Sequence, residues 1–331
     1  MKRKSTENDE IVPTPVNHGV RWQRGRLIGK GSFGSVFMAS LRRPISKFSI
    51  FPPVMAVKSA EVSDSETLQK EKQNYDNLKQ CDSLIKCFGE EITTDENGQM
   101  IYNLLLEFAT AGTLADQIKN TGGKGLEEKE VWSYTRSIIK GLIHIHKNQY
   151  VHCDLKPENI LLVPRNSANG RRCVAKIGDL GLAKRTSKTK KDRYLRGTVP
   201  YMAPETLLYS VQESPSDIWA LGCVVLEMLT GNRPWSGGGG GDDTEEITRR
   251  FGEKYEIPII PEGAVLSAEA RAFLKVCFVR KPEYRFTAEM LMLLPFLAED
   301  EEEEEESVVG APRFVEKARR SKRQRIPIQA V

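Results

Sequence analysis

The stretch HCDLKPEN, residues 152–159, places an acid, a cation and an amide within six residues, directly after the strand-like pair Tyr150-Val151. Farther along the chain, DLG at residues 179–181 follows a second predicted strand, Val174 to Ile177. Two acids and an amide on adjacent loops can hold a divalent metal ion through oxygen ligands. Taken singly, each of these segments is also compatible with a helix cap or a turn.

A glycine-rich stretch, GKGSFG at residues 29–34, lies upstream. Its three glycines allow the backbone to approach a phosphate closely, with N–H groups free to donate. The same spacing occurs in dinucleotide-binding folds, where a helix follows directly and an acid comes about 20 residues later. Here residues 35–38 (SVFM) continue as a strand, which argues against that alternative. A chance glycine cluster in a hairpin remains an alternative on these residues alone.

Lys58 ends an apolar strand, Val54 to Val57, where a cation would be buried unless it had partners. A phosphate and a carboxylate would supply them, and Glu71 lies on the following predicted helix, Ser65 to Leu78. The glycine loop, this pair, HCDLKPEN and DLG follow one another in an order that chance does not explain.

The sequence pattern changes near Thr110 to Gly112. Before this point the chain is mostly strand with one helix, and it includes a long hairpin loop at 41–53 and a buried strand at Gln99 to Ala109. After it, apolar residues between Glu127 and Asn148 follow the spacing of one helix face. Further helices are predicted at Ser214 to Thr230, Ser267 to Val279 and Thr287 to Leu294. A β-rich part followed by a helical part predicts two lobes, with the ligand cleft between them.

Composition is ordinary for a globular protein, with 39% hydrophobic and 28% charged residues among 331. The longest apolar run, Ile218 to Leu226, is far shorter than the ~20 residues that span a bilayer, so we expect no membrane partner. The N-terminus shows basic residues without an apolar core, so no secretory signal is expected. The six cysteines form no CxxC pair, and we expect reduced thiols in the cytoplasm or nucleus.

Charge is unevenly distributed near the C-terminus. Residues 299–306 are eight consecutive acids, and residues 307–331 carry seven Lys or Arg against one Glu. We expect a flexible lead at 1–20, a globular body that ends near Leu297, and a disordered acidic and then basic tail at 298–331. The basic part fits a signal for the nuclear import machinery. The alternative is that it interacts with the acidic run.

From Trp22 to Leu297 the chain resembles a eukaryotic protein kinase. The matching segments, in order, are GKGSFGSV, MAVK, the helix glutamate Glu71, HCDLKPEN, DLG, APE at 203–205, SDIWALGC at 216–223, and Arg285. The resemblance implies an α+β bilobal fold at 21–297, with a small β-rich N-lobe at about 21–110 and a larger helical C-lobe at about 111–297. Within the family, HCDLKPEN, DLGLAK and GTVPYMAPE resemble plant-type mitogen-activated protein kinase kinase kinases.

The resemblance also implies site residues. The catalytic residues would be Asp154 as the base, Lys156 on the γ-phosphate, and Lys58 held by Glu71; Asn159 and Asp179 would hold Mg²⁺. ATP would be bound by Ile28, Gly29, Lys30, Gly31, Ser32, Phe33, Gly34, Ser35, Val36, Ala56, Lys58, Glu107, Ala109 and Leu161. Leu106 would be the gatekeeper, and Glu107 and Ala109 would offer backbone groups to adenine. Lys156, with Thr198 in the substrate platform, indicates serine/threonine substrates.

Two positions depart from the family pattern. Cys153 stands where the family usually has an arginine that binds a phosphate on the activation segment, so we expect weak dependence on phosphorylation of that segment. Leu180 replaces a phenylalanine and keeps an apolar side chain, so little effect is expected. The resemblance also implies a buried ion pair between Glu205 and Arg285, and a bracing role for His152.

The sequence therefore predicts an ATP-dependent serine/threonine kinase, with MAP kinase kinases as substrates. A pseudokinase scaffold is the alternative, although Lys58, Asp154, Asn159 and Asp179 are all present. A nucleic-acid-binding module would rest only on the basic tail, which lacks interleaved aromatic residues, so no specific nucleic acid is expected.

Overall fold

The computed structural model describes residues 18–31, 34–42, 51–79, 81–167, 170–186, 195–236, 243–261 and 263–298. The predicted lead up to residue 17, much of the activation segment, the glycine run at 237–241 and the predicted tail from 299 onward lie outside these residues.

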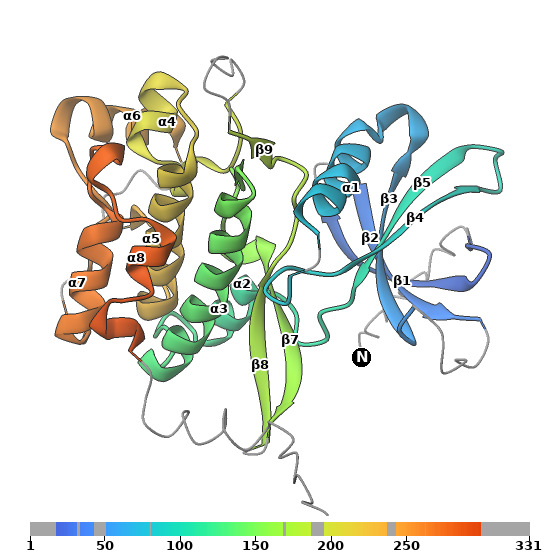
Figure 1. Ribbon diagram of the computed structural model, residues 1–331, viewed down its shortest axis with the longest axis horizontal. Coiled ribbons are helices and arrows are strands. Elements are labelled where there is room, and N and C mark those ends of the chain that lie inside the picture. Colours follow the sequence, from blue (N-terminus) through green and yellow to red (C-terminus); the bar gives the residue numbers. More distant parts are fainter. Residues whose placement is uncertain are drawn as a thin grey trace, which may run out of the picture. The chain divides into compact units, whose positions relative to one another are not determined.

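The N-terminal part is built around one antiparallel sheet of five strands (Figure 1), in the order β1-β2-β3-β5-β4. The strands are β1 (Trp22–Gly31), β2 (Gly34–Leu41), β3 (Val54–Glu61), β4 (Cys87–Thr94) and β5 (Met100–Glu107). In this register Lys58 lies opposite Val36 on one side and Leu104 on the other. The sheet thus places the lysine beside the glycine-rich hairpin. The predicted strand at 99–109 is confirmed as β5.

One helix, α1 (Glu66–Leu78), crosses the sheet and confirms the helix predicted at 65–78. Its buried side chains include Leu68, Leu78 and the carboxylate of Glu71. Leu68 and Leu78 pack into the main hydrophobic core. The buried face of this helix therefore carries one charged residue, Glu71, and one amide, Asn74, among apolar and aromatic side chains. A smaller cluster, centred on Trp22 and Met55, is buried elsewhere in the sheet region.

The C-terminal part is mainly helical (Figure 1). Its helices are α2 (Leu114–Asn120), α3 (Glu128–Lys147), α4 (Pro204–Tyr209), α5 (Ser214–Thr230), α6 (Thr244–Arg249), α7 (Ala268–Cys277) and α8 (Ala288–Leu291). Helix α5 is the central element, because fifteen of its seventeen residues are buried. A helix that is apolar all round belongs inside a core. α3, α5 and α7 confirm the predicted helices, with ends within two residues of the expected ones.

The prediction of a helix over Thr287–Leu294 is wrong at its C-terminal end. Helix α8 begins after the Thr287 cap but stops at Leu291. Pro295 follows soon afterwards, and because the residue directly before a proline disfavours helical angles, the helix is not expected to continue through Leu294. A 3₁₀ turn, Pro295–Leu297, then closes the described body.

Two pairs of antiparallel strands lie between these helices in the sequence. β6 (Tyr150–Val151) pairs with β9 (Lys184–Arg185), and β7 (Ile160–Ser167) pairs with β8 (Gly170–Ile177). A 3₁₀ turn, Pro157–Asn159, leads into β7. The predicted α+β architecture of two lobes is therefore confirmed. Within the described residues, no helix is both long enough and apolar enough to cross a membrane.

Candidate active site

Lys58 on β3 is held by two carboxylates. Its Nζ lies 2.8 Å from Oε2 of Glu71 and 3.0 Å from Oδ1 of Asp179. Burial disfavours the ammonium form, yet the two carboxylates raise the pKa of Lys58 above its ordinary value. Burial raises the pKa of Glu71 to about 7, with Lys58 acting in the opposite direction. The structure thus brings together a helix, a strand and the DLG loop around one cation.

A second contact ties α1 to the DLG loop. The side-chain amide of Asn74, which is buried, donates to the backbone carbonyls of Leu180 (2.8 Å) and Ala183 (3.1 Å). Because Asn74 lies one turn after Glu71, both residues face the same loop. Sequence reasoning missed Asn74, although its polar side chain on the apolar face of an amphipathic helix was a visible signal.

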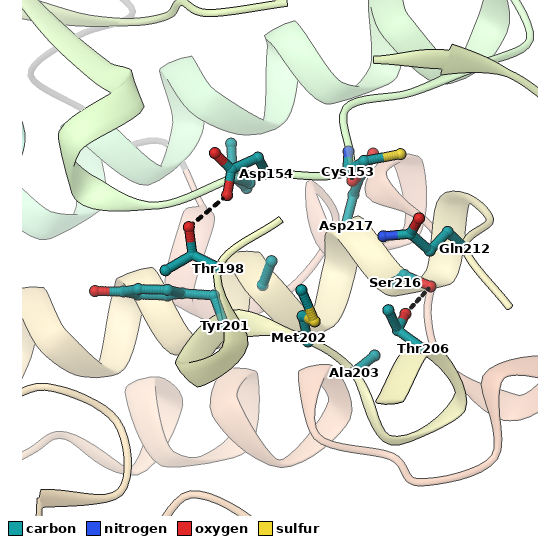
Figure 2. A pocket seen from close by; sticks show the side chains of 12 residues that line it. Cys153, Asp154, Thr198, Tyr201, Met202, Ala203, Thr206, Gln212, Ser216 and Asp217 are labelled. Atoms are coloured by element: carbon teal, nitrogen blue, oxygen red, sulfur yellow. Dashed lines mark hydrogen bonds between the residues drawn. The ribbon is translucent and has the colours of Figure 1, made fainter. Parts of the chain in front are cut away.

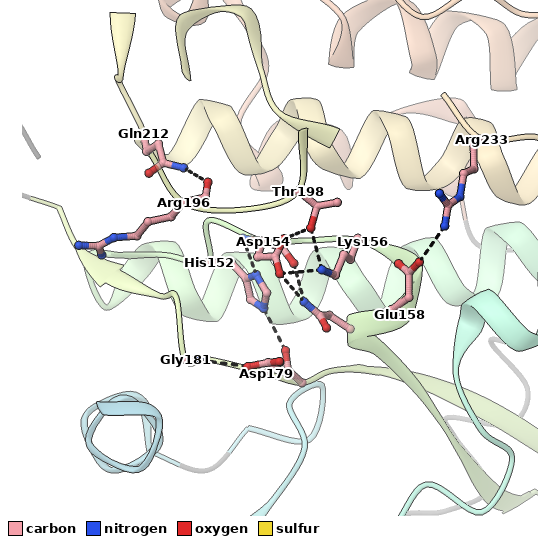
Figure 3. Close-up of polar contacts among 12 residues, drawn as sticks. His152, Asp154, Lys156, Glu158, Asp179, Gly181, Arg196, Thr198, Gln212 and Arg233 are labelled. Carbon is pink, nitrogen blue, oxygen red and sulfur yellow. Dashed lines mark hydrogen bonds and ion pairs between the residues drawn. The ribbon is translucent and has the colours of Figure 1, made fainter. Parts of the chain in front are cut away.

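Asp154 lies at the centre of a hydrogen-bond network (Figure 3). Thr198 donates its hydroxyl to Oδ1 of Asp154 at 2.7 Å, and Lys156 lies 3.0 Å from Oδ2. Lys156 also donates to the hydroxyl oxygen of Thr198 at 2.7 Å. Asn159 donates its amide to Oδ2 of Asp154 at 3.1 Å. The predicted base, cation and amide therefore meet at one point, with Thr198 from the activation segment.

His152 braces the loop that carries Asp154. Its Nε2 donates to the carbonyl of Gly178 at 3.0 Å, and its Nδ1 accepts from the N–H of Asp154 at 3.2 Å. This geometry gives His152 the bracing position that the resemblance implies, and it ties the Asp154 loop to the residue before Asp179.

Asp217, in the first turn of α5, also holds the loop that carries Asp154. It accepts from the N–H of His152 at 2.9 Å and from the N–H of Cys153 at 3.1 Å. Its Oδ2 also lies 2.8 Å from Nε2 of His146. Burial disfavours its charge, but the bond from His146 keeps the pKa of Asp217 below its ordinary value. Asp217 belongs to the motif SDIWALGC, but the sequence alone did not predict that it fixes the loop that carries Asp154.

The glycine-rich stretch forms the β1–β2 hairpin. Gly31 lies opposite Gly34, whose φ is +137°. A Cβ at Gly34 would collide with the carbonyl oxygen of Ser59 on β3, so glycine is required there. Because strand β2 follows directly and not a helix, the dinucleotide-binding alternative does not fit. Ser32 and Phe33 lie outside the described residues.

The predicted adenine-binding residues lie along β3, β5, β7 and the segment after β5. Ala56 lies opposite Leu106 in the sheet, and Leu161 bridges to Thr113. Glu107 is the last residue of β5 and leads to Ala109. These positions are compatible with the roles that the resemblance implies, which stay predictions.

Lys176 on β8 is a residue that sequence reasoning missed. Its Nζ lies 3.0 and 2.9 Å from the two carboxylate oxygens of Glu107. Glu107 also accepts from the N–H of Lys86 and donates its own N–H to the Lys86 carbonyl. Lys176 is 7% exposed, so this pair is largely removed from water. A lysine inside the apolar strand before DLG was the available signal.

Two predicted metal ligands fit a Mg²⁺ ion by their chemistry. Asp179 offers a carboxylate and Asn159 an amide oxygen, the ligands that hard divalent cations prefer. They are held next to each other, because Gly178 donates its N–H to the carbonyl of Asn159 at 2.8 Å. When bound, the ion would neutralise phosphate charge at this place.

The predicted pair of Glu205 and Arg285 is present and buried. Its two hydrogen bonds measure 2.7 and 3.0 Å, and Arg285 also donates to the carbonyl of Pro215 at 2.6 Å. The bidentate geometry compensates for the burial of both charges. The pair joins the first turn of α4 to the segment after α7, and the bond to Pro215 ties both to the start of α5.

Comparison with known proteins gives the family. The protein kinase domain family matches residues 22–297. The chain is 41% identical over 285 residues to mitogen-activated protein kinase kinase kinase 20 of Arabidopsis thaliana, covering 85% of this chain and 79% of that protein. It is 37% identical over 278 residues to mitogen-activated protein kinase kinase kinase 17 of the same plant, covering 84% and 70%. It is 32% identical over 310 residues to the serine/threonine-protein kinase SSK22 of Saccharomyces cerevisiae, covering 86% and 21%.

The fold, the Lys58 and Asp154 networks and these similarities define a serine/threonine protein kinase. The chain belongs to the protein kinase domain family. The predicted resemblance to plant mitogen-activated protein kinase kinase kinases is confirmed by the relatives it matches. Membership of the family implies the use of ATP with Mg²⁺.

Proposed function

We propose that this kinase transfers the γ-phosphate of ATP to serine or threonine residues of MAP kinase kinases. The observation that carries catalytic competence is the double network around Lys58 and Asp154, in which every predicted catalytic side chain has its partner. The relatives named as mitogen-activated protein kinase kinase kinases support the substrate class.

In the proposed reaction, the substrate hydroxyl lies at Asp154, which accepts its proton. The oxygen attacks the γ-phosphorus while the bond to the oxygen bridging the β- and γ-phosphorus breaks, and ADP leaves. Lys156 donates hydrogen bonds to the transferring group, and Lys58 holds the α- and β-phosphates. Mg²⁺, held by Asp179 and Asn159, would supply further charge stabilisation. Such catalysis depends on positioning and electrostatics.

The test is transfer of label from γ-labelled ATP to an inactive MAP kinase kinase, with bacterially produced protein and Mg²⁺. The Asp179→Asn variant is the control. Label that disappears in the control would support the proposal. Label in a generic protein but not in the MAP kinase kinase would refute the cascade position and keep the kinase. Binding of ATP without any transfer would favour a scaffold, the pseudokinase alternative.

We also propose that the protein is located in both the cytoplasm and the nucleus, and that its basic tail directs import into the nucleus. The tail carries Lys317, Arg319, Arg320, Lys322, Arg323 and Arg325. Clusters of this kind suit nuclear import receptors. Deleting residues 307–331 from a fluorescent fusion should reduce nuclear signal, and unchanged nuclear entry would refute the import role.

A further inference from the structure

The segment Arg196-Gly197-Thr198 meets the catalytic loop, and its last residue, Thr198, lies directly beside Asp154 (Figure 2). Gly197 has a φ of +109°, and a Cβ there would collide with the carbonyl oxygen of Cys153. The next residue, Thr198, makes the hydrogen bond to Asp154. Arg196 lies two residues before Thr198, so a contact that fixes its backbone also restrains the chain that leads to Thr198.

Gln212 reaches this segment from the loop between α4 and α5 (Figure 3). Its Nε2 donates to the backbone carbonyl of Arg196 at 2.6 Å. Because a carbonyl oxygen can only accept, the amide nitrogen must be the atom that faces it. Gln212 is only 4% exposed, so water competes little for this bond.

The loop that carries Gln212 is itself fixed. The N–H of the preceding residue, Val211, donates to the carbonyl of Glu205 at 3.1 Å, and its carbonyl accepts from Thr206 at 3.0 Å. Glu205 is locked by its buried ion pair with Arg285. The amide of Gln212 thus projects from a rigid part of the C-terminal lobe.

Cys153 cannot hold the segment through a phosphate. Its Sγ lies 3.6 Å from the carbonyl oxygen of Val151, and the thiol has no positive charge to offer. Burial raises the pKa of Cys153 well above its ordinary value. Cys153 and Gln212 line the same cavity of about 20 Å³ beside Asp217 (Figure 2). The neutral amide of Gln212 therefore holds the activation segment, which the thiol of Cys153 cannot do through a phosphate.

We propose that Gln212 is a positioning residue that holds Arg196, and through it Thr198, in the active arrangement without phosphorylation of the activation segment. The proposal rests on the kinase activity and is independent of which protein is the substrate. This contact would explain how the kinase remains active without a phosphate on the activation segment, as expected from the cysteine at position 153.

The experiment compares Gln212→Ala and Gln212→Glu with the wild-type protein after phosphatase treatment, with mass spectrometry to verify that the activation segment carries no phosphate. Glu keeps the size of Gln but faces the carbonyl with an acceptor. Initial rates are measured on a generic protein substrate. We expect kcat to fall at least fivefold in both variants, while KM for ATP stays within twofold. The wild-type protein should remain active.

Gln99→Glu is the matched control, because Gln99 is exposed in the turn before β5. It should leave both constants unchanged. Thermal stabilisation by a non-hydrolysable ATP analogue should be the same in all variants, which shows that the fold and the nucleotide site are intact. A fall in kcat below fivefold, a loss explained by unfolding or by weaker ATP binding, or an inactive dephosphorylated wild type would each overturn the proposal. A wild type active on the generic protein but not on a MAP kinase kinase would refute only the proposed substrate.

Discussion

At the scale of single residues, Glu71 combines burial with a negative charge, and the two oppose each other. Its side chain is fully buried, and burial raises its pKa to about 7 from an ordinary value of 4.5. Lys58 compensates for only part of this cost. The residue that orders the phosphate-binding lysine therefore destabilises the folded protein when it is ionised.

This conflict predicts a pH dependence of stability. Between about pH 5 and pH 7 the folded protein holds a proton at Glu71 that the unfolded chain has released. The free energy of unfolding should therefore fall as pH rises through this window and level off above it. Between these two pH values, the free energy of unfolding of the wild type should fall by more than about 1 kcal/mol relative to that of the variant Glu71→Gln.

Urea unfolding at several pH values measures this difference, since groups common to both proteins cancel. Glu66→Gln, at the exposed start of the same helix, should show no such trend. A difference between wild type and Glu71→Gln that stays constant or grows with pH would contradict the assignment.

Lys176 gives a second residue-scale prediction. Its bidentate contact with Glu107 links β8 to the end of β5, where backbone groups are expected to meet adenine. Lys176→Met leaves the half-buried carboxylate of Glu107 without its cation, so the end of β5 should lose its fixed position. KM for ATP should rise about tenfold, or about 1.4 kcal/mol.

Lys140→Met, on an exposed position of α3, serves as the control. Steady-state kinetics with varied ATP separates the two constants. A variant at Lys176 with unchanged KM and reduced kcat would show that the pair acts on catalysis and not on nucleotide binding.

At the scale of elements, the activation segment is anchored at both described ends. At the first end, β9 pairs with β6, and Thr186 donates its N–H to the carbonyl of Gln149 at 2.8 Å. At the second, Thr198 donates to Asp154. Both anchors are hydrogen bonds between groups of the protein itself.

Alanine substitution of Thr186, Ser187 or Thr189 should therefore change kcat/KM by much less than tenfold. Phosphotransfer to a protein substrate measures it. Thr198→Ala should behave differently, because its hydroxyl contacts both Asp154 and Lys156, and its loss should lower kcat strongly. A tenfold loss at any of the first three positions would show that a phosphate is required after all.

At the scale of the whole molecule, the described body closes at its last 3₁₀ turn. Leu297 is fully buried, Phe296 packs against Phe273 with ring centroids 5.1 Å apart, and Arg136 donates to the carbonyl of Leu297 at 2.6 Å. The residues up to Leu297 thus complete the core, as the limits of the family match also indicate.

Truncation after Ala298 should therefore preserve folding and phosphotransfer to a generic protein. Truncation after Pro295 removes two buried apolar side chains and should cost at least about 3 kcal/mol of stability. Thermal unfolding of the two truncated proteins tests this. Equal melting temperatures would show that the last turn contributes nothing to the core.

Much of the fold could be predicted from local patterns. The sequence predicts α3 because its apolar residues follow the spacing of one helix face, which is a local signal. The shortened α8 and the unpredicted helices α2 and α4 have four to seven residues each, too few to show a period. Their ends depend on caps and on packing against other elements.

The sequence by itself determined the kinase class, because its motifs keep their residue types and order whatever the rest of the chain does. Only the tertiary structure revealed Asn74, Lys176, Gln212 and Asp217 as supports of the site. Each acts through hydrogen bonds to residues from 16 to 109 positions away. No local pattern encodes such a contact, because it exists only once the chain has folded and excluded water from both partners.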